Sequence, residues 1–362
     1  MGMKTKVLVL SLCLSLFIGL FFTADTNALS TLALTLTTDQ PFYRLQMYVP
    51  STINVVGNLT LNGTRVSDGL VALTVFQGKI GHYVRPILFR TVATGSLPPQ
   101  NWSLNVSLGV LGLRGSQYVP QTVFTRPSSQ TDQGPAFNIT LKNTASLLKL
   151  YLTLTIFDAA KVPIITMNVT KIDQPIPPGS LLSIIVPPTP LKGWAALGNA
   201  TAYVSAFDNM PPYEYFPYCP EASSRFTIVP SGGGQMSTQE NLNTPTERIS
   251  SSINGNYNLT FKINYYQALP FYIPWGNYTV EASSSYQGKQ AINSHTFWVR
   301  IPGDVNGDGV VNVLDINPIA RYWQRTVPPA PAYADLNGDG IINLLDLNWV
   351  AVTWLKREQP LP

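Results

Sequence analysis

Short runs in which apolar and polar residues alternate fill most of the chain between residues 30 and 301. Examples are LALTLTTD from Leu32, GLVALTVFQG from Gly69 and LYLTLTIFD from Leu150. These runs are rich in Thr, Val and Tyr, and turn-forming Gly, Pro and Asn residues separate them. A period of two with many β-branched residues is typical of strands that bury one face. The pattern therefore predicts a mainly β protein.

The order of these runs indicates two sandwiches, one of them interrupted. The runs before residue 100 resemble the opening half of an immunoglobulin-like or macroglobulin-type β-sandwich, whose later strands do not follow directly. Matching strands appear only after residue 253, as GNYNLTFKI and GNYTVEASSS. We therefore predict an immunoglobulin-like sandwich built from 30–100 and 253–301, with a second immunoglobulin-like sandwich inserted at 101–229. Three serial units are the alternative, with 253–301 as a small independent sheet.

Two further stretches lie outside the predicted sandwiches. Residues 1–28 combine two early lysines, an apolar run and a small-residue cleavage site ending at Ala28, as export signal peptides do. We therefore expect a secreted protein, extracellular or at the cell surface, with membrane attachment only if this segment is retained. Residues 230–252 are polar and contain many Gly and Ser residues, which predicts a flexible linker.

The pattern changes to a tandem repeat from Gly303. The chain reads GDVNGDGVVNVLDINPIARYWQR and then, in register, ADLNGDGIINLLDLNWVAVTWLKR. Each half has the spacing of a twelve-residue calcium loop, in which positions 1, 3, 5, 7, 9 and 12 supply oxygen atoms. Apolar residues after each loop fall at i, i+3, i+4 and i+7, which predicts a helix. Residues 303–357 are too few for a strong core, so metal binding should supply much of the folding free energy.

The repeat offers matched oxygen donors for two Ca²⁺ ions. Position 7 needs only its backbone carbonyl, so an apolar side chain is acceptable there, and position 12 is Asp in place of the usual Glu. A turn without metal is the alternative, but two loops in register argue against it. The predicted ligands are Asp304, Asn306, Asp308, Val310, Asn312 and Asp315 for one ion, and Asp335, Asn337, Asp339, Ile341, Asn343 and Asp346 for the other.

These D-x-N-x-D-G-x-(V/I)-N-x-x-D loops, each followed by a helix, resemble a dockerin domain. The resemblance implies docking onto a cohesin domain, which attaches secreted proteins, often polysaccharide-degrading enzymes, to a scaffold. Better-known members contact the partner through loop positions 10 and 11, often Ser or Thr, and through basic residues later in the helix. The corresponding residues here are Val313, Leu314, Leu344 and Leu345, with Arg321, Arg325, Lys356 and Arg357. The aliphatic side chains depart from that pattern, as does Pro318 inside the first predicted helix.

Composition and charge limit the kinds of partner and of covalent modification that we expect for this chain. Charged residues make up only 12% of the chain and form no basic stripe, so nucleic acid is not expected as a partner. Cleavage after Ala28 would leave Cys219 as the only cysteine, which excludes an intramolecular disulfide. If the host glycosylates proteins, we expect surface glycans on some of nine Asn-x-Ser/Thr sequons. They begin at Asn58, Asn62, Asn101, Asn105, Asn138, Asn168, Asn199, Asn258 and Asn277.

No catalytic constellation emerges from residues 30–301. The two histidines are far apart in sequence, and no two of the sparse acidic residues stand out as the carboxylate pair that glycoside hydrolysis needs. The aromatic segments 211–218 and 265–275 either pack onto a sandwich or stack on sugar rings. We predict a non-catalytic secreted protein with immunoglobulin-like spacer or binding modules and a calcium-dependent docking module. The alternative is a carbohydrate-binding protein or glycoside hydrolase of a polysaccharide-degrading complex.

Overall fold

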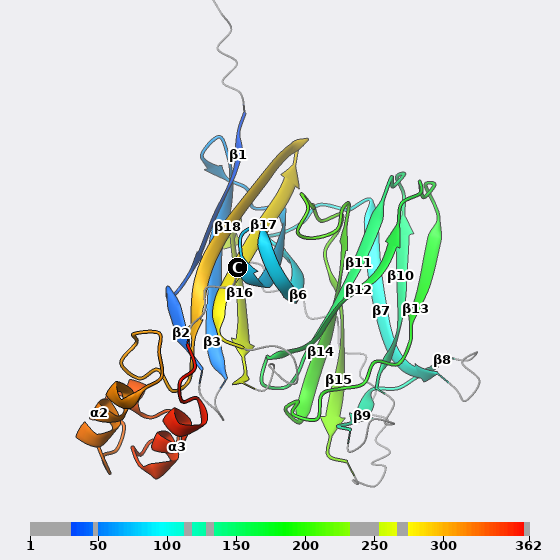
Figure 1. The fold of residues 1–362 in the computed structure, drawn as a ribbon. Coiled ribbons are helices and arrows are strands. Elements are labelled where there is room, and N and C mark those ends of the chain that lie inside the picture. Colours follow the sequence, from blue (N-terminus) through cyan, green and yellow to red (C-terminus); the bar gives the residue numbers. More distant parts are fainter. Residues whose placement is uncertain are drawn as a thin grey trace, which may run out of the picture.

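The computed structural model describes residues 30–45, 50–111, 118–127, 134–231, 253–265 and 274–357. The predicted signal peptide and nearly all of the predicted linker lie outside these residues. The described part is mainly β, with two sandwiches and a small helical unit after the last strand (Figure 1). No helix in the described ranges is both long and apolar enough to span a membrane.

The first sandwich draws its strands from both ends of the described chain. One sheet has the order β1-β3-β16, with the short β4 beside β3, and the facing sheet has the order β2-β18-β17-β5-β6. The strands are β1 (Leu32–Thr38), β2 (Phe42–Arg44), β3 (Ser51–Leu61), β4 (Thr64–Arg65), β5 (Leu70–Lys79), β6 (His82–Ala93), β16 (Asn256–Ile263), β17 (Gly276–Tyr286) and β18 (Lys289–Arg300). All neighbours are antiparallel except β2 and β18, which are parallel.

The second sandwich is built entirely from the chain between β6 and β16. Its sheets have the orders β13-β10-β7-β8 and β12-β11-β14-β15-β9. The strands are β7 (Trp102–Leu111), β8 (Tyr118–Pro120), β9 (Val123–Thr125), β10 (Ala136–Asn143), β11 (Leu150–Phe157), β12 (Pro163–Ile172), β13 (Leu181–Val186), β14 (Gly198–Phe207) and β15 (Ala222–Val229). The short β9 is parallel to β15, as β2 is to β18.

The two sandwiches share one topology and one strand register. In both, a five-stranded sheet ends in a short parallel strand, and its two central strands are β5 and β17 or β11 and β14. Phe76 pairs with Thr279 in the first sandwich, and Phe157 pairs with Thr201 in the second. Both threonines lie three residues after a glycine with φ of +115°, Gly276 or Gly198. The chain therefore contains the same β unit twice.

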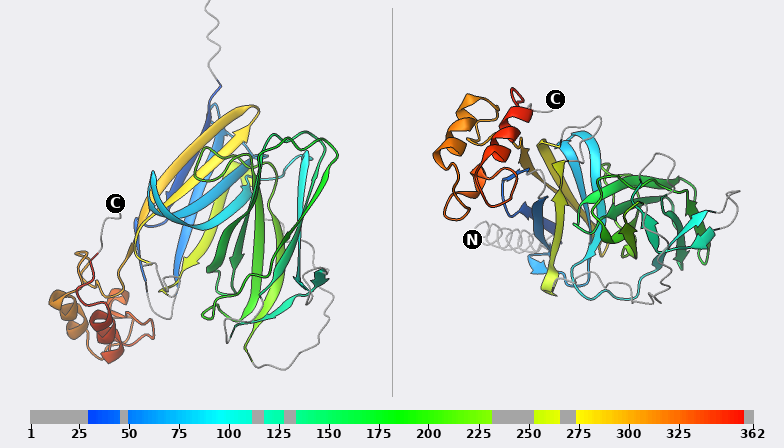
Figure 2. Two further views of the ribbon diagram at one scale, coloured as in Figure 1. Left: turned by 45° about the vertical axis from the view of Figure 1, so that its right-hand side comes forward. Right: turned by 90° about the horizontal axis from the view of Figure 1, so that it is seen from below.

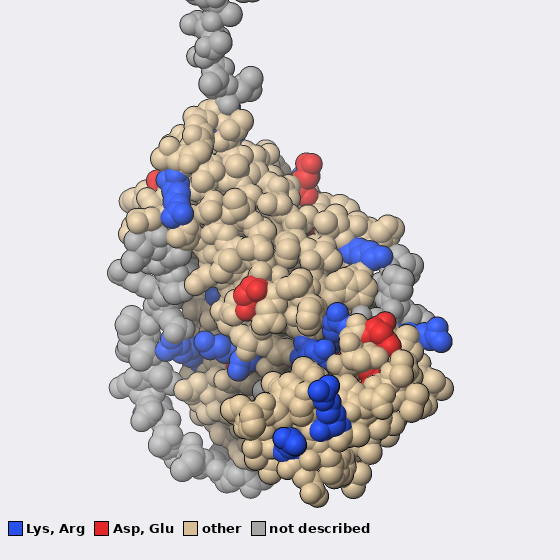
Figure 3. All heavy atoms as spheres, turned by 90° about the vertical axis from the view of Figure 1, so that its left-hand side faces the viewer, with Lys and Arg blue, Asp and Glu red and all other residues tan. Residues whose placement is uncertain are grey.

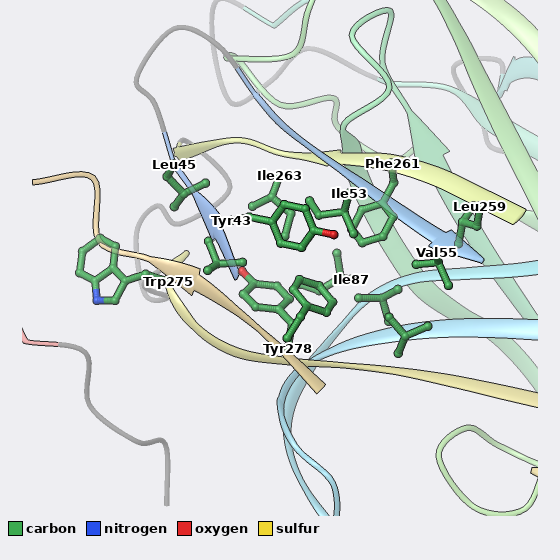
Figure 4. Packing of buried hydrophobic residues seen from close by; sticks show 14 of the residues in the cluster. Tyr43, Leu45, Ile53, Val55, Ile87, Leu259, Phe261, Ile263, Trp275 and Tyr278 are labelled. Atoms are coloured by element: carbon green, nitrogen blue, oxygen red, sulfur yellow. The ribbon is translucent and has the colours of Figure 1, made fainter. Parts of the chain in front are cut away.

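The core of the first sandwich follows the alternation of its strands. Tyr257, Leu259 and Phe261 of β16 are buried, whereas the residues between them are exposed. Figure 4 shows Phe261 facing Tyr43 and Tyr278 from the opposite sheet. Tyr278 also stacks on Phe297 of β18, with 5.5 Å between ring centroids. Alternation thus sends one face of each strand into the space between the sheets.

Strands β5, β11 and β17 are buried on both faces, because the two large sheets pack against each other. Two aromatic residues of the segment 211–218, Tyr215 and Phe216, are buried, whereas Tyr213 is exposed. Tyr215 is fully buried with its hydroxyl 2.5 Å from the Thr74 hydroxyl, and Ser283 donates to the Tyr215 carbonyl. Phe207 packs edge-on against Tyr215 at 5.4 Å. These aromatic side chains are therefore packing residues between the sandwiches.

Arg90 and Glu221 form a buried ion pair across the same interface. The Arg90 Nη2 atom lies 2.5 Å from Glu221 Oε1, and the Glu221 side chain is 1% exposed. The backbone N–H of Thr91 donates to the other carboxylate oxygen at 2.8 Å. The guanidinium of Arg90 lies over the ring of Tyr203, 3.5 Å from its centroid. The pair therefore joins β6 of the first sandwich to the second.

Glu221→Ala should destabilise the protein by about 3 kcal/mol, because it leaves the Arg90 guanidinium buried without its carboxylate. Urea unfolding measures the change. Lys171→Ala is the matched control, since the Lys171–Asp173 pair is exposed on both sides and should contribute little. Equal effects of the two substitutions would contradict the structural role given to Arg90–Glu221.

Glu281→Gln should leave the protein equally stable or more stable at pH 7. Burial raises the pKa of Glu281, and hydrogen bonds from Tyr83 and Tyr215 offset this only in part. The folded protein thus binds this proton more tightly than the unfolded chain, so stability falls as pH rises through the folded pKa, above the ordinary value of 4.5. Gln keeps an acceptor for Tyr83, 3.0 Å away, without the charge. Between pH 4 and 8, the free energy of unfolding of Glu281→Gln should change less with pH than that of wild type. The exposed Glu214→Gln should leave this pH dependence unchanged.

Candidate metal centre

The helical unit after β18 contains two equivalent loop–helix pairs. Helix α2 (Val313–Arg321) follows the first loop, and α3 (Leu344–Val352) follows the second, with a single turn η3 (Ala332–Ala334) between them. Both helices begin with a capping box, in which Asn312 or Asn343 is the N-cap. Both helices are shorter than the apolar spacing predicted. Trp323 and Trp354, the last apolar positions of the pattern, lie beyond the ends of the helices.

The first loop is held by the carboxylates at its two ends. Asp304 Oδ1 accepts the N–H of Gly307 at 2.8 Å, and its Oδ2 accepts that of Gly309 at 3.0 Å. Asp315 Oδ1 accepts the N–H groups of Val305 and Asn306, at 2.7 and 3.0 Å. Its other oxygen accepts the N–H of Asn312 at 2.8 Å. Positions 1 and 12 therefore shape the loop from opposite sides.

The second loop repeats this arrangement. Asp335 accepts the N–H groups of Gly338 and Gly340 at 2.8 and 2.9 Å. Asp346 accepts the N–H of Leu336 at 2.6 Å and that of Asn343 at 2.8 Å. Gly309 and Gly340, at position 6, have φ of +83° and +87°, a conformation that glycine adopts without strain. The sequence repeat is thus also a repeat of hydrogen bonds.

Each loop buries carboxylates close together, so their negative charges repel each other. Asp304, Asp315 and Asp346 are fully buried, and Asp335 is nearly so. Burial raises the pKa of Asp304 and the nearby Asp315 charge raises it further, while backbone N–H groups and Arg300 lower it. Burial likewise raises the pKa of Asp346, with a smaller contribution from Asp335. A divalent cation would offset this repulsion, and an all-oxygen donor set fits calcium.

The other predicted ligands make contacts within their own loops. Asp308 at position 5 accepts the N–H of Val310 and the side-chain amide of Asn306, both at 2.9 Å. Asn312 accepts the N–H of Leu314 as the helix cap, and its amide lies 3.3 Å from the Val310 carbonyl. Within the described ranges, no three His, Cys, Asp or Glu side chains form a ready metal cluster. Calcium would therefore need the amide and carbonyl oxygens of Asn306 and Val310 as well as carboxylates.

The first loop also rests on the first sandwich, a contact that the sequence did not reveal. Arg44 of β2 donates to the Asp304 carbonyl at 2.9 Å, and Arg300 of β18 donates to the Gly307 carbonyl at 2.6 Å. The two arginines are paired in the parallel β2–β18 register. The core of the helical unit is continuous with that of the first sandwich, on the side away from the second sandwich (Figure 2).

The second aromatic segment contributes to the same contact. Tyr265 packs edge-on against Trp349 of α3, with 5.0 Å between ring centroids. Trp275 is buried. The other aromatic residues of this segment, Tyr266, Phe271 and Tyr272, lie outside the described residues.

Other candidate side chains lie apart from the loops. His295 approaches the Thr38 hydroxyl at 3.0 Å, while His82 is exposed on β6. Cys219 is buried, and burial raises the pKa of its thiol to about 12. Asp158 accepts the backbone N–H groups of Ala160 and Val162 in its own turn and that of Ala196 before β14. The structure thus gives these residues local contacts and does not bring them together.

Comparison with known proteins places a family match on the helical unit. Residues 302–352 match the dockerin type I domain, a span that contains both loops and both helices. No curated protein matches the chain.

Similar solved structures include the C-terminal domain of wzt, at 7% identity and TM-score 0.26, covering 36% of this chain and 75% of that one. A calcium-binding mutant of Bacteroides uniformis beta-glucuronidase 2 has 10% identity and TM-score 0.23, with coverages of 50% and 26%. A Salmonella alpha-2-macroglobulin mutant has 11% identity and TM-score 0.20, with coverages of 74% and 23%. This chain therefore spans about a quarter of the latter two proteins, and similarity this low supports no functional argument. The family match therefore identifies a dockerin type I domain within this chain, at residues 302–352.

Proposed function

We propose that this is a secreted, non-catalytic protein that attaches its two sandwiches to a cohesin-type partner through a dockerin domain holding two Ca²⁺ ions. The observation that carries the proposal is the repeated loop, with the same buried carboxylates and the same hydrogen bonds twice. Dockerin domains bind calcium and typically bind cohesins. Two equivalent loops support two ions in this chain.

The proposed ions would be held by the twelve residues that the sequence predicts. Bound calcium supplies positive charge at a point where Asp304 and Asp315, or Asp335 and Asp346, lie buried together. The protein's own part is to hold these carboxylates with backbone N–H groups, so that less conformational freedom is lost on binding. Arg300 Nη1, 3.5 Å from Asp304 Oδ2, offsets part of the charge in the first loop.

The proposed docking surface lies on the first turns of the two helices. Val313 and Leu314 are 61% and 51% exposed, and Leu344 and Leu345 are 65% and 55% exposed. Four aliphatic side chains at equivalent places in a repeat are costly to leave in water, and such patches commonly bind partners. Figure 3 shows Lys and Arg side chains spread over the middle and lower part of this side of the molecule. We infer a partner surface that is apolar at its centre and acidic around it.

The contacts of Arg44, Arg300 and Tyr265 support a spacer role for the sandwiches. They connect the dockerin domain directly to the first sandwich, so that docking would present the sandwiches in a defined direction. A polysaccharide-degrading or carbohydrate-binding role is the alternative that the dockerin match favours. Tyr215 and Phe216 do not support it, because both are buried and offer no stacking surface.

Calcium titration of the full chain should give about two bound ions, and chelation should lower the Tm. Asp315→Asn and Asp346→Asn should each reduce the count to about one, because each removes a closing charge while keeping one oxygen acceptor for the loop. Isothermal titration calorimetry measures the stoichiometry. Glu214→Gln, on an exposed residue of the second sandwich, should leave it unchanged. Absence of binding at millimolar calcium would contradict the proposal.

The double substitution Leu344→Asp and Leu345→Asp should weaken cohesin binding at least about tenfold, because it places charges at the centre of the apolar surface. Biolayer interferometry against a panel of purified cohesin domains measures affinity, with calcium stoichiometry as the check on folding. Leu181→Asp is the control, since Leu181 is 70% exposed on the second sandwich. If no cohesin binds the wild-type chain, the proposed partner class is wrong.

A further inference from the structure

A polar cleft of about 640 Å³ lies between the two sandwiches. Its walls come from β6 and β16 of the first sandwich, and from β14, β15 and the turn after β11 in the second. The volume is within the range of small-molecule sites, about 300–1,000 Å³. The cleft therefore has room for a few sugar rings.

Each sandwich contributes one complete glycosylation sequon to this cleft. Residues i and i+2 of a strand share a face, so the Asn and the Thr of an N-x-T sequon point the same way. The middle residues, Ala200 and Leu259, are buried in the two cores, and both asparagines are exposed. The sequon residues that line the cleft are Asn199 and Thr201 of β14 with Asn258 and Thr260 of β16.

The corresponding sequon of the first sandwich provides an internal contrast. Asn277 follows Gly276 at the start of β17, as Asn199 follows Gly198 at the start of β14. Asn277 is nevertheless only 1% exposed, and the Thr279 hydroxyl donates to the Gly78 carbonyl at 2.8 Å. The folded protein therefore has room for a saccharide at Asn199 and none at Asn277, although the two sequence motifs match.

We propose that Asn199 and Asn258 carry N-linked saccharides that occupy the cleft and connect the two sandwiches. In the reaction, the side-chain amide nitrogen bonds to the anomeric carbon of a saccharide carried on a lipid diphosphate. The lipid diphosphate leaves, and the amide nitrogen loses one proton. The inference rests on the proposed export of the protein, because the lipid-linked donor is used on exported chains.

The side chains around the two sequons suit a saccharide. Arg225 and the exposed Lys161 place hydrogen-bond donors at the cleft, and Asp158 beside them is held by its own turn. The Tyr203 ring and the Arg90 guanidinium stacked on it form a flat wall. Sugar hydroxyl groups accept and donate hydrogen bonds, so a covalently attached chain would replace the water that otherwise fills a polar cleft.

Glycopeptide mapping by mass spectrometry tests the proposal on full-length protein secreted by cells that perform N-linked glycosylation. We expect saccharide on the peptides containing Asn199 and Asn258, and none on the peptide containing Asn277. Asn199→Gln and Asn258→Gln should each reduce the intact mass by one saccharide. The matched controls Thr201→Ser and Thr260→Ser retain the sequons and should retain both saccharides.

Saccharide at exposed sequons away from the cleft, such as Asn105 or Asn168, with both cleft asparagines bare, would overturn the proposal. A secreted chain with no saccharide at all would overturn it equally, and so would saccharide on Asn277. If a sugar binds the cleft only non-covalently, the intact mass would equal that of the unmodified polypeptide and no glycopeptide would be found. This result would also contradict the proposal. None of these measurements involves calcium or a cohesin, so their outcome is independent of the docking function.

Discussion

The first sandwich cannot close until β16 pairs with β3 and β17 pairs with β5, across the whole of the inserted sandwich. Leu259 and Phe261 of β16 fill the core beside Ile53 and Val55 of β3, so without the late strands this core would lie open to water. Such long-range pairing is slow, because chain entropy is lost before the contacts form. All strand pairs of the second sandwich lie within its own segment, so it should fold first, which brings the two halves of its host together.

The interface between the sandwiches then becomes a second requirement. In this interface the two large sheets pack face to face, and several buried polar groups have specific partners. Arg90 of β6 meets Glu221 of the second sandwich, and Ser283 of β17 donates to the Tyr215 carbonyl. The hydroxyl of Tyr215 reaches Thr74. Buried polar contacts of this kind tolerate little displacement, because a shift leaves donors or charges without partners. The two sandwiches therefore behave as one body.

Much of this architecture could be predicted from residue patterns, and the parts that could not share a physical reason. Alternation identifies the residues that share a face of a strand, as in β16, and loop spacing identifies Asp304 and Asp315 as partners. Neither pattern indicates which part of the molecule covers a given face of a strand. The segment containing Tyr215 therefore left both packing and sugar stacking open, and Asn199 and Asn277 have the same motif in opposite environments. Helix length was also misjudged, because apolar periodicity continued to Trp354 after the hydrogen bonding of α3 had ended.

The contact between β18 and the dockerin domain determines how the molecule would bear tension. A force applied through the docked domain would enter β18 at Arg300, next to the arginine contacts on the first loop. It would run along the strand, which pairs with β17 from Lys289 to Val299 and with β2 near its end. Force in this direction loads all the ladder hydrogen bonds together in shear and does not peel them apart one by one. The strand that joins the anchor to the sandwich is thus the one best placed to resist extension.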